Sequence, residues 1–344
     1  MTHMVNRKGI APTHLFFSDD IMIFCKGNIK SLRNLVDLLG LYQRASGQTV
    51  SREKSKLYFG GGSLNRRATI SAFLGMPIAI FPDRYLGVKV MPEAIKYHHV
   101  ANVVEKIKEE LAGWKGRMLS FQDRVVLVKS VLASYSIHNM AVYKWPRKFI
   151  HECEVAIQNF LWSGGSKVSR SFVVAYDKIC APYEEGGLGI TQLSVTNRAL
   201  LMGLWWKIRN SNKVWARFLR AKFFMRNAKL VHYVKSSILT AIADLLEDYA
   251  LDCAILEGDM LNEGGWNLSE ECRNNLLAAG FVEEDFPRTL NGVDRRVWKP
   301  NYTGSFTVSS AKSLIRKKYA KLVGPNLLWR PTVHPALAAR NGKY

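Results

Sequence analysis

The chain of 344 residues is long enough for one large domain, or for two to three smaller domains with a buried core. It has no apolar run of about 18 residues or more, which excludes a transmembrane helix. Its first residues lack the apolar core of a signal peptide. Five scattered cysteines without a C-x-x-C pair predict reduced thiols, no zinc site, and an intracellular protein of the nucleus or the cytoplasm.

The charge of the chain is strongly uneven. The net charge is +21, yet residues 244–294 hold 13 acidic and 2 basic residues. The remainder holds 47 basic and 15 acidic residues, a net charge of +32. Such an excess favours a polyanionic partner, which is RNA, DNA or an acidic protein, over a generic basic surface kept for solubility.

Two apolar runs flank Ser18-Asp19-Asp20 between His14 and Cys25. Short apolar runs joined by turn-forming residues predict a β-hairpin of buried strands. The hairpin then carries two adjacent carboxylates at its tip, and buried like charges are costly unless a cation lies beside them. A divalent metal would meet that need. The alternative is a solvated turn that contains two common turn residues.

Helical and extended segments then alternate. A helix is expected from about Ser31, its N-cap, to Ser46-Gly47, and a shorter one from Arg66 to Leu74. From Pro92 the apolar period is helical, with Ser120 as an N-cap and Pro146 at the first position of a later helix. Further helices are expected at 243–256 and 269–279.

The order of three motifs resembles reverse transcriptases of the non-LTR, LINE type. Phe17-Ser18-Asp19-Asp20 resembles their aspartate box, Ser46-Gly47 with Lys54-Ser55 resembles the motif after the next helix, and Tyr85-Leu86-Gly87 resembles the start of the primer-grip hairpin. The resemblance implies that Asp19 and Asp20 bind catalytic Mg²⁺ or Mn²⁺. It also places Lys54 near the incoming triphosphate. One departure is Ser51, where the family has Asn. A single strand with a glycine bulge is the alternative at Gly87.

The later motifs resemble the thumb of plant LINE reverse transcriptases. The thumb motifs begin with Trp114-Lys115-Gly116-Arg117 and continue through Arg124 and Lys129 to Val131, and the run Asn197 to Trp205 resembles a later part of the same family. A helical thumb binds a duplex through phosphate contacts. Lys115, Arg117, Arg124 and Lys129 are therefore the expected contacts, and ordinary helix-surface charge is the alternative for each of them.

The element pattern predicts an α+β fold, and the resemblance implies a partial palm followed by a mainly helical thumb and connection. The predicted parts are the palm remnant at 1–92, the thumb at 93–180 and a helical connection at 181–243. An acidic segment and a truncated zinc-binding-like module without its zinc ligands complete the chain at 244–344. Membranes are not expected as partners.

The function implied by the resemblance is RNA-directed DNA polymerisation. Only 15 residues precede Phe16, so we expect the fingers and the first catalytic aspartate to be missing and the chain to be inactive alone, unless an upstream half acts in trans. We also expect an exposed apolar face on the palm remnant, where upstream strands would pair. The alternatives are a non-specific RNA- or DNA-binding protein and a degenerate fragment without a selected role.

Overall fold

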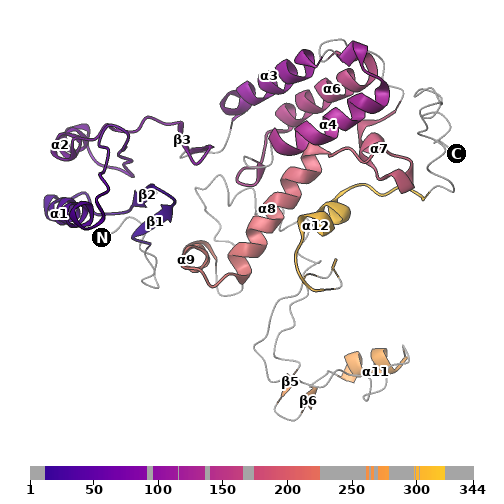
Figure 1. Ribbon diagram of the computed structural model, residues 1–344. Coiled ribbons are helices and arrows are strands. Elements are labelled where there is room, and N and C mark those ends of the chain that lie inside the picture. The colour runs from indigo at the N-terminus through magenta and orange to yellow at the C-terminus, as the bar shows by residue number, and fades with distance from the viewer. Residues whose placement is uncertain are drawn as a thin grey trace.

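The computed structural model describes residues 12–90, 96–114, 116–135, 140–165, 174–224 and 298–321 without 299 and 302, together with 261–262, 265–266 and 270–278. The fold is α+β, as the sequence predicts, and its strands form two-stranded antiparallel sheets. No helix in these ranges combines the length and the apolar character that a membrane span requires. Figure 1 shows an N-terminal unit beside a helical body.

The N-terminal unit, residues 12–90, contains two hairpins and two helices. Its elements are β1 His14–Phe17, β2 Asp20–Ile23, α1 Ile29–Ser46, α2 Leu64–Leu74, β3 Asp83–Tyr85 and β4 Val88–Val90. The prediction that Ser31 caps α1 is wrong. The cap is Asn28, whose Oδ1 accepts a hydrogen bond from the Ser31 backbone N–H at 2.7 Å. The helix ends at Gly47 in the left-handed conformation, where glycine avoids a Cβ clash.

The core of this unit is small. Leu32, Ile70 and Leu74 are its fully buried members, packed against half-buried neighbours such as Leu57 and Phe59. The prediction of buried strands at the aspartate hairpin is wrong, because all of β1 and most of β2 are exposed. The expected exposed apolar face is confirmed: the hairpin contributes Leu15, Phe16, Phe17, Ile21 and Ile23, with Phe16 64% and Phe17 61% exposed.

The helical body contains most of the buried core. Its elements are α3 Tyr97–Gly113, η1 Gly116–Met118, α4 Phe121–Tyr135, α6 Arg147–Ser163, α7 Tyr176–Cys180, η2 Tyr183–Glu185, α8 Leu193–Asn210 and α9 Val214–Phe223. Ser120 caps α4 as predicted: the Asp123 backbone N–H donates to Ser120 Oγ at 3.2 Å, and the Asp123 carboxylate accepts from Ser120 in return. Pro146 occupies the N-cap of α6, one residue before the predicted position.

The C-terminal elements pack in part on α8. They are β5 Leu261–Asn262, β6 Gly265–Trp266, α11 Glu270–Ala278 and α12 Val308–Ile315. Trp298 is fully buried beside Phe306 and Trp206, so it anchors this segment on α8. The helix predicted at 269–279 is confirmed over 270–278, whereas the one at 243–256 lies outside the described residues. The four domain boundaries stay predictions.

A buried asparagine joins α8 to the loop before α6. Asn197 is 2% exposed, and its Oδ1 accepts the Trp145 backbone N–H at 2.9 Å. Its Nδ2 donates to the carbonyl oxygens of Met140 and Tyr143, each at 2.7 Å. The Tyr143 hydroxyl then donates to the Lys89 carbonyl of β4 at 2.7 Å. This chain of hydrogen bonds connects the helical body to the N-terminal unit.

Replacing Asn197 with Ala is expected to lower the free energy of unfolding by about 2–4 kcal/mol, because one buried N–H and two carbonyls lose their partner. Urea unfolding measures the effect. The matched control is Asn210→Ala, which removes one hydrogen bond from an exposed side chain and should cost about 0.5 kcal/mol or less. Equal losses in the two variants would contradict the role given to Asn197.

The exposed face of the hairpin should bind the apolar dye ANS and promote self-association. Phe16→Ser is expected to reduce both, since it removes the most exposed aromatic side chain of β1. Met118→Ser is the control, because Met118 is 83% exposed but belongs to η1 on the helical body. Dye fluorescence and sedimentation velocity provide the readouts. Wild-type protein that remains monomeric and does not increase ANS fluorescence at high concentration would refute the prediction.

Candidate active site

The aspartate motif forms a hairpin, as the sequence predicts, and its turn has two residues. Phe17 pairs with Asp20 across the strands, so Ser18 and Asp19 form the turn. Ser18 has a φ of 53°, the positive value that the first position of a type II′ turn requires. Asp19 and Asp20 are both exposed. Both carboxylates are therefore accessible to solvent at the tip of the hairpin, and burial does not require a cation there.

The Tyr85-Leu86-Gly87 motif forms a second hairpin. Tyr85 pairs with Val88, and the intervening residues have φ values of 48° for Leu86 and 79° for Gly87. Two positive values define a type I′ turn, which matches the twist of the strands on either side. The motif is a hairpin, as the resemblance implies, and the alternative of a single strand with a glycine bulge is wrong.

 Asp20 and Tyr85 belong to different hairpins and lie 65 positions apart in the sequence. Burial raises the pKa of Tyr85, and the nearby Asp20 carboxylate raises it further. A charge effect of this kind falls off with distance, so its direction is consistent with two hairpins that lie near each other in the N-terminal unit.

Asp83 fixes the second hairpin to the segment after Lys54. Its carboxylate accepts Lys56 Nζ at 2.6 Å and the Tyr58 hydroxyl at 2.5 Å. The hydrogen bond from Lys56 is the largest cause that lowers the Asp83 pKa to about 2. Burial, followed by the bond to Asp83, raises the Tyr58 pKa to about 12. Lys54 itself is exposed, and its role at a triphosphate stays a prediction.

The predicted phosphate contacts differ in their surroundings. Arg117 is exposed in η1, as a phosphate-binding side chain must be. Arg124 instead donates to the carbonyl oxygens of Leu119 and Leu161, so it stabilises the fold around α4 and α6. Lys129 Nζ donates to the Tyr183 hydroxyl at 2.9 Å. Lys115 lies outside the described residues. All four phosphate contacts stay predictions.

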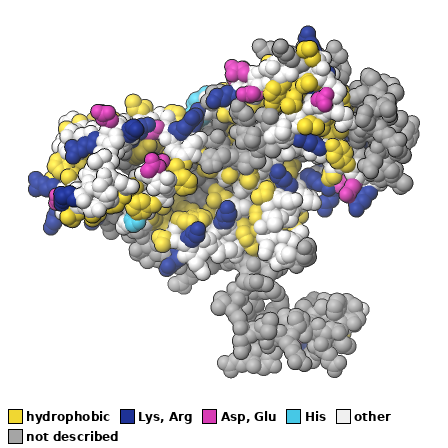
Figure 2. All heavy atoms as spheres, in the orientation of Figure 1, with side chains coloured by type: hydrophobic (Ala, Val, Ile, Leu, Met, Phe, Trp, Pro, Cys, Tyr) yellow, Lys and Arg dark blue, Asp and Glu magenta, His cyan; other side chains and the backbone are white. Residues whose placement is uncertain are grey.

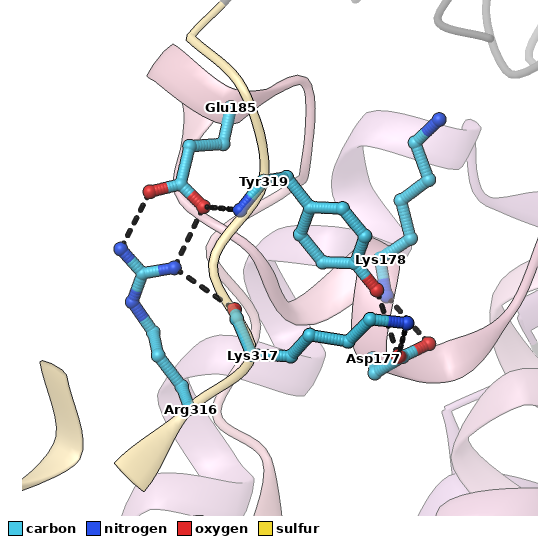
Figure 3. Close-up of polar contacts among 6 residues, drawn as sticks. All are labelled: Asp177, Lys178, Glu185, Arg316, Lys317 and Tyr319. Carbon is cyan, nitrogen blue, oxygen red and sulfur yellow. Dashed lines mark hydrogen bonds and ion pairs between the residues drawn. The ribbon is translucent and has the colours of Figure 1, made fainter. Parts of the chain in front are cut away.

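A pair of ionic contacts that the sequence analysis missed holds the C-terminal segment on the helical body. We call Asp177, Glu185, Arg316, Lys317 and Tyr319 the latch (Figure 3). Arg316 binds the Glu185 carboxylate through two hydrogen bonds of 2.7 and 2.6 Å, and the Tyr319 backbone N–H donates to it at 3.0 Å. The Tyr319 hydroxyl donates to Asp177 at 2.7 Å, beside Lys317 at 3.4 Å.

The loop that presents Glu185 depends on glycine. A Cβ on Gly187 would lie 2.0 Å from the Ala181 carbonyl oxygen, so only glycine allows this close approach. The chain reverses here, and the Leu188 N–H donates to the Ile179 carbonyl at 2.8 Å. The sequence signal for this loop is the run Gly186-Gly187-Leu188-Gly189. Arg316, the ionic partner of Glu185, lies 131 positions further along the chain, so no local pattern predicts the pair.

The residues described do not include a cluster of three or more His, Cys, Asp or Glu side chains that could hold a metal. Asp19 and Asp20 supply two neighbouring carboxylates, which suit Mg²⁺ or Mn²⁺ when substrate phosphates and water complete the coordination. The donor chemistry is therefore compatible with a divalent ion. By themselves the two exposed side chains provide a weak site.

Comparison with known proteins gives one distant similarity. No protein-family model matches the chain. A curated Arabidopsis thaliana protein named "Putative ribonuclease H protein" is 28% identical over 135 residues. The match covers 39% of this chain and 22% of that relative, so the chain spans only about a fifth of the relative's length.

The Asp83 contacts should make part of the stability depend on pH. The carboxylate has a lowered pKa in the folded protein, so its contribution is fully present above the ordinary value near 4 and is lost as the pH falls toward 2. Asp83→Ala should therefore destabilise the N-terminal unit at pH 7, by about 1–3 kcal/mol, and by less at pH 3. Urea unfolding followed by tyrosine fluorescence measures this. A difference that is constant between these pH values would contradict the assignment.

Proposed function

We propose that this chain is part of a retroelement reverse transcriptase of the non-LTR type and contributes its aspartate hairpin and its nucleic-acid-binding surface. The observation that carries the proposal is that both motifs form tight hairpins in the N-terminal unit, where the Asp20 charge contributes to the raised pKa of Tyr85. In such an enzyme the carboxylates hold the metal that activates the primer end, and the Tyr85 hairpin holds the primer. Both features must therefore meet at one place.

The similarity to the plant ribonuclease H protein supports the coarser part of the proposal, a retroelement-related nucleic-acid enzyme. Mg²⁺ or Mn²⁺ is the proposed cofactor, bound by Asp19 and Asp20. The proposed partners are RNA, DNA or their hybrid, and a further segment that supplies the fingers and the remaining aspartate is a proposed partner in trans. The exposed face of β1 and β2 supports the last point, because strands of this length rarely remain uncovered.

A second candidate function is non-specific nucleic-acid binding without catalysis. The exposed Arg117 and the net charge of +32 outside residues 244–294 favour it. Figure 2 shows Lys and Arg side chains on both the N-terminal unit and the helical body. This function needs the basic surface and not the aspartates, so variants of the two regions separate the candidates.

Binding of an RNA–DNA hybrid should weaken steeply with salt, because each phosphate that is neutralised releases condensed counterions. Lys115→Gln combined with Arg117→Gln should reduce the log–log slope by about two. Fluorescence anisotropy at several salt concentrations measures it. The control combines Lys106→Gln with Lys207→Gln, which removes the same charge from exposed positions on α3 and α8. Equal slopes for the two double variants would contradict a specific role of Lys115 and Arg117 and would leave only binding by general positive charge.

Luminescence of Tb³⁺ tests the metal and the approach of the hairpins together, because a neighbouring tyrosine sensitises emission from a bound lanthanide. Wild-type protein should emit, Mg²⁺ should compete, and Asp19→Asn with Asp20→Asn should abolish the signal. Tyr85→Phe should reduce emission without changing the affinity for Tb³⁺, whereas Tyr183→Phe on η2 should have no effect. Emission that is unchanged in both the aspartate and the Tyr85 variants would exclude this site.

A further inference from the structure

A cleft of about 630 Å³ lies where α12 meets α4, the η2 loop and the start of α8. None of the residues that line it belongs to the two hairpins. Its volume falls within the range of about 300–1,000 Å³ that is typical of small-ligand sites. On the face shown in Figure 2, Lys and Arg side chains gather near α12.

The charges that line the cleft leave a positive excess. Four cationic and two anionic side chains line it, and the latch already pairs Arg316 with Glu185 and Lys317 with Asp177. Lys312 is half-buried, and none of the carboxylates that the structure describes forms an ion pair with it. Lys129 contacts Tyr183, which is neutral. Glu184 is exposed at the rim. Two lysines consequently keep an uncompensated charge in the cleft.

A buried hydroxyl also lines the cleft without a partner. Thr196 is 2% exposed, and its Oγ1 lacks a hydrogen bond among the described residues. A buried polar atom of this kind is uncommon unless a ligand or water completes it. Thr196 lines the cleft, so a ligand with hydrogen-bonding groups would complete its hydroxyl.

An aromatic ring completes the set. Tyr183 is 44% exposed and lines the cleft, and Lys129 Nζ lies 4.5 Å from its ring centroid. Such rings provide a surface on which bases stack, and lysines beside them bind phosphate. An inorganic anion would use the lysines but leave the ring and most of the volume unfilled.

We infer that this cleft binds a nucleotide, with its phosphate at Lys129 and Lys312 and its base against Tyr183. Thr196 supplies a hydrogen bond to the ligand. The nucleotide is either free or the 5′-phosphorylated end of a strand, since both present the same groups. The inference goes beyond the proposed function, because the site lies apart from the aspartate hairpin and can exist whether or not that hairpin binds metal.

Calorimetric titration of the full chain with AMP tests the site. Lys129→Gln combined with Lys312→Gln should weaken binding at least about tenfold, since two charge-assisted phosphate contacts are lost. Tyr183→Leu should weaken AMP by about tenfold and leave inorganic phosphate unchanged, because only the base uses the ring. Lys207→Gln, an exposed position on α8, is the charge-matched control and should bind like wild type.

Two further measurements complete the test. Thr196→Val keeps the shape of the buried side chain but removes its hydroxyl, so its affinity for AMP tests the site even if the double variant fails to fold. A 5′-phosphorylated oligothymidylate that competes with AMP, where its unphosphorylated form does not, would identify a strand end, and competition by AMP alone would identify a free nucleotide. Equal affinity for AMP and inorganic phosphate, or wild-type affinity in the Thr196, Tyr183 and lysine variants, would overturn the inference.

Discussion

The arrangement of the helical body depends on one buried amide. Asn197 must satisfy its three hydrogen bonds away from water, and it does so only when α8 lies against the loop at residues 140–145. Two other contacts build on this position. Trp298 and Phe306 pack on α8, and the Tyr143 hydroxyl holds β4. A single polar residue thus sets where both the C-terminal segment and the Tyr85 hairpin attach.

The N-terminal unit differs from the helical body. The Asp83 contacts lie within the unit itself, and the apolar side chains of its first hairpin are exposed. Asp83 gathers Lys56 and Tyr58 around the base of the second hairpin, and the Asp20 charge contributes to the raised pKa of Tyr85 in the same hairpin. Three fully buried apolar residues form its core, while Phe16 and Phe17 remain largely exposed. This is the pattern expected of a surface that functions against a partner, whether nucleic acid or another protein segment.

The sequence was sufficient to predict the hairpins, the capping of α4 by Ser120 and the α+β class, since these features depend on neighbouring residues. An apolar run carries no information on what covers it, so the pattern alone wrongly indicated buried strands in the aspartate hairpin, whereas the expected exposed apolar face is present. The cap of α1 was misplaced by one turn because Asn28 and Ser31 are both good capping residues. The Arg316–Glu185 pair and the approach of Asp20 to Tyr85 arise from tertiary packing, for which no local signal exists.

The central claim is that the two hairpins meet at the end of a bound primer. Photocrosslinking tests it most directly, with a 4-thiothymidine at the 3′ end of the DNA strand in an RNA–DNA hybrid and adducts mapped by mass spectrometry. The account predicts adducts at residues 16–20 and 85–87 in the same sample, and their loss when the thiobase is moved to the 5′ end. Adducts confined to the helical body, with none on either hairpin, would contradict it.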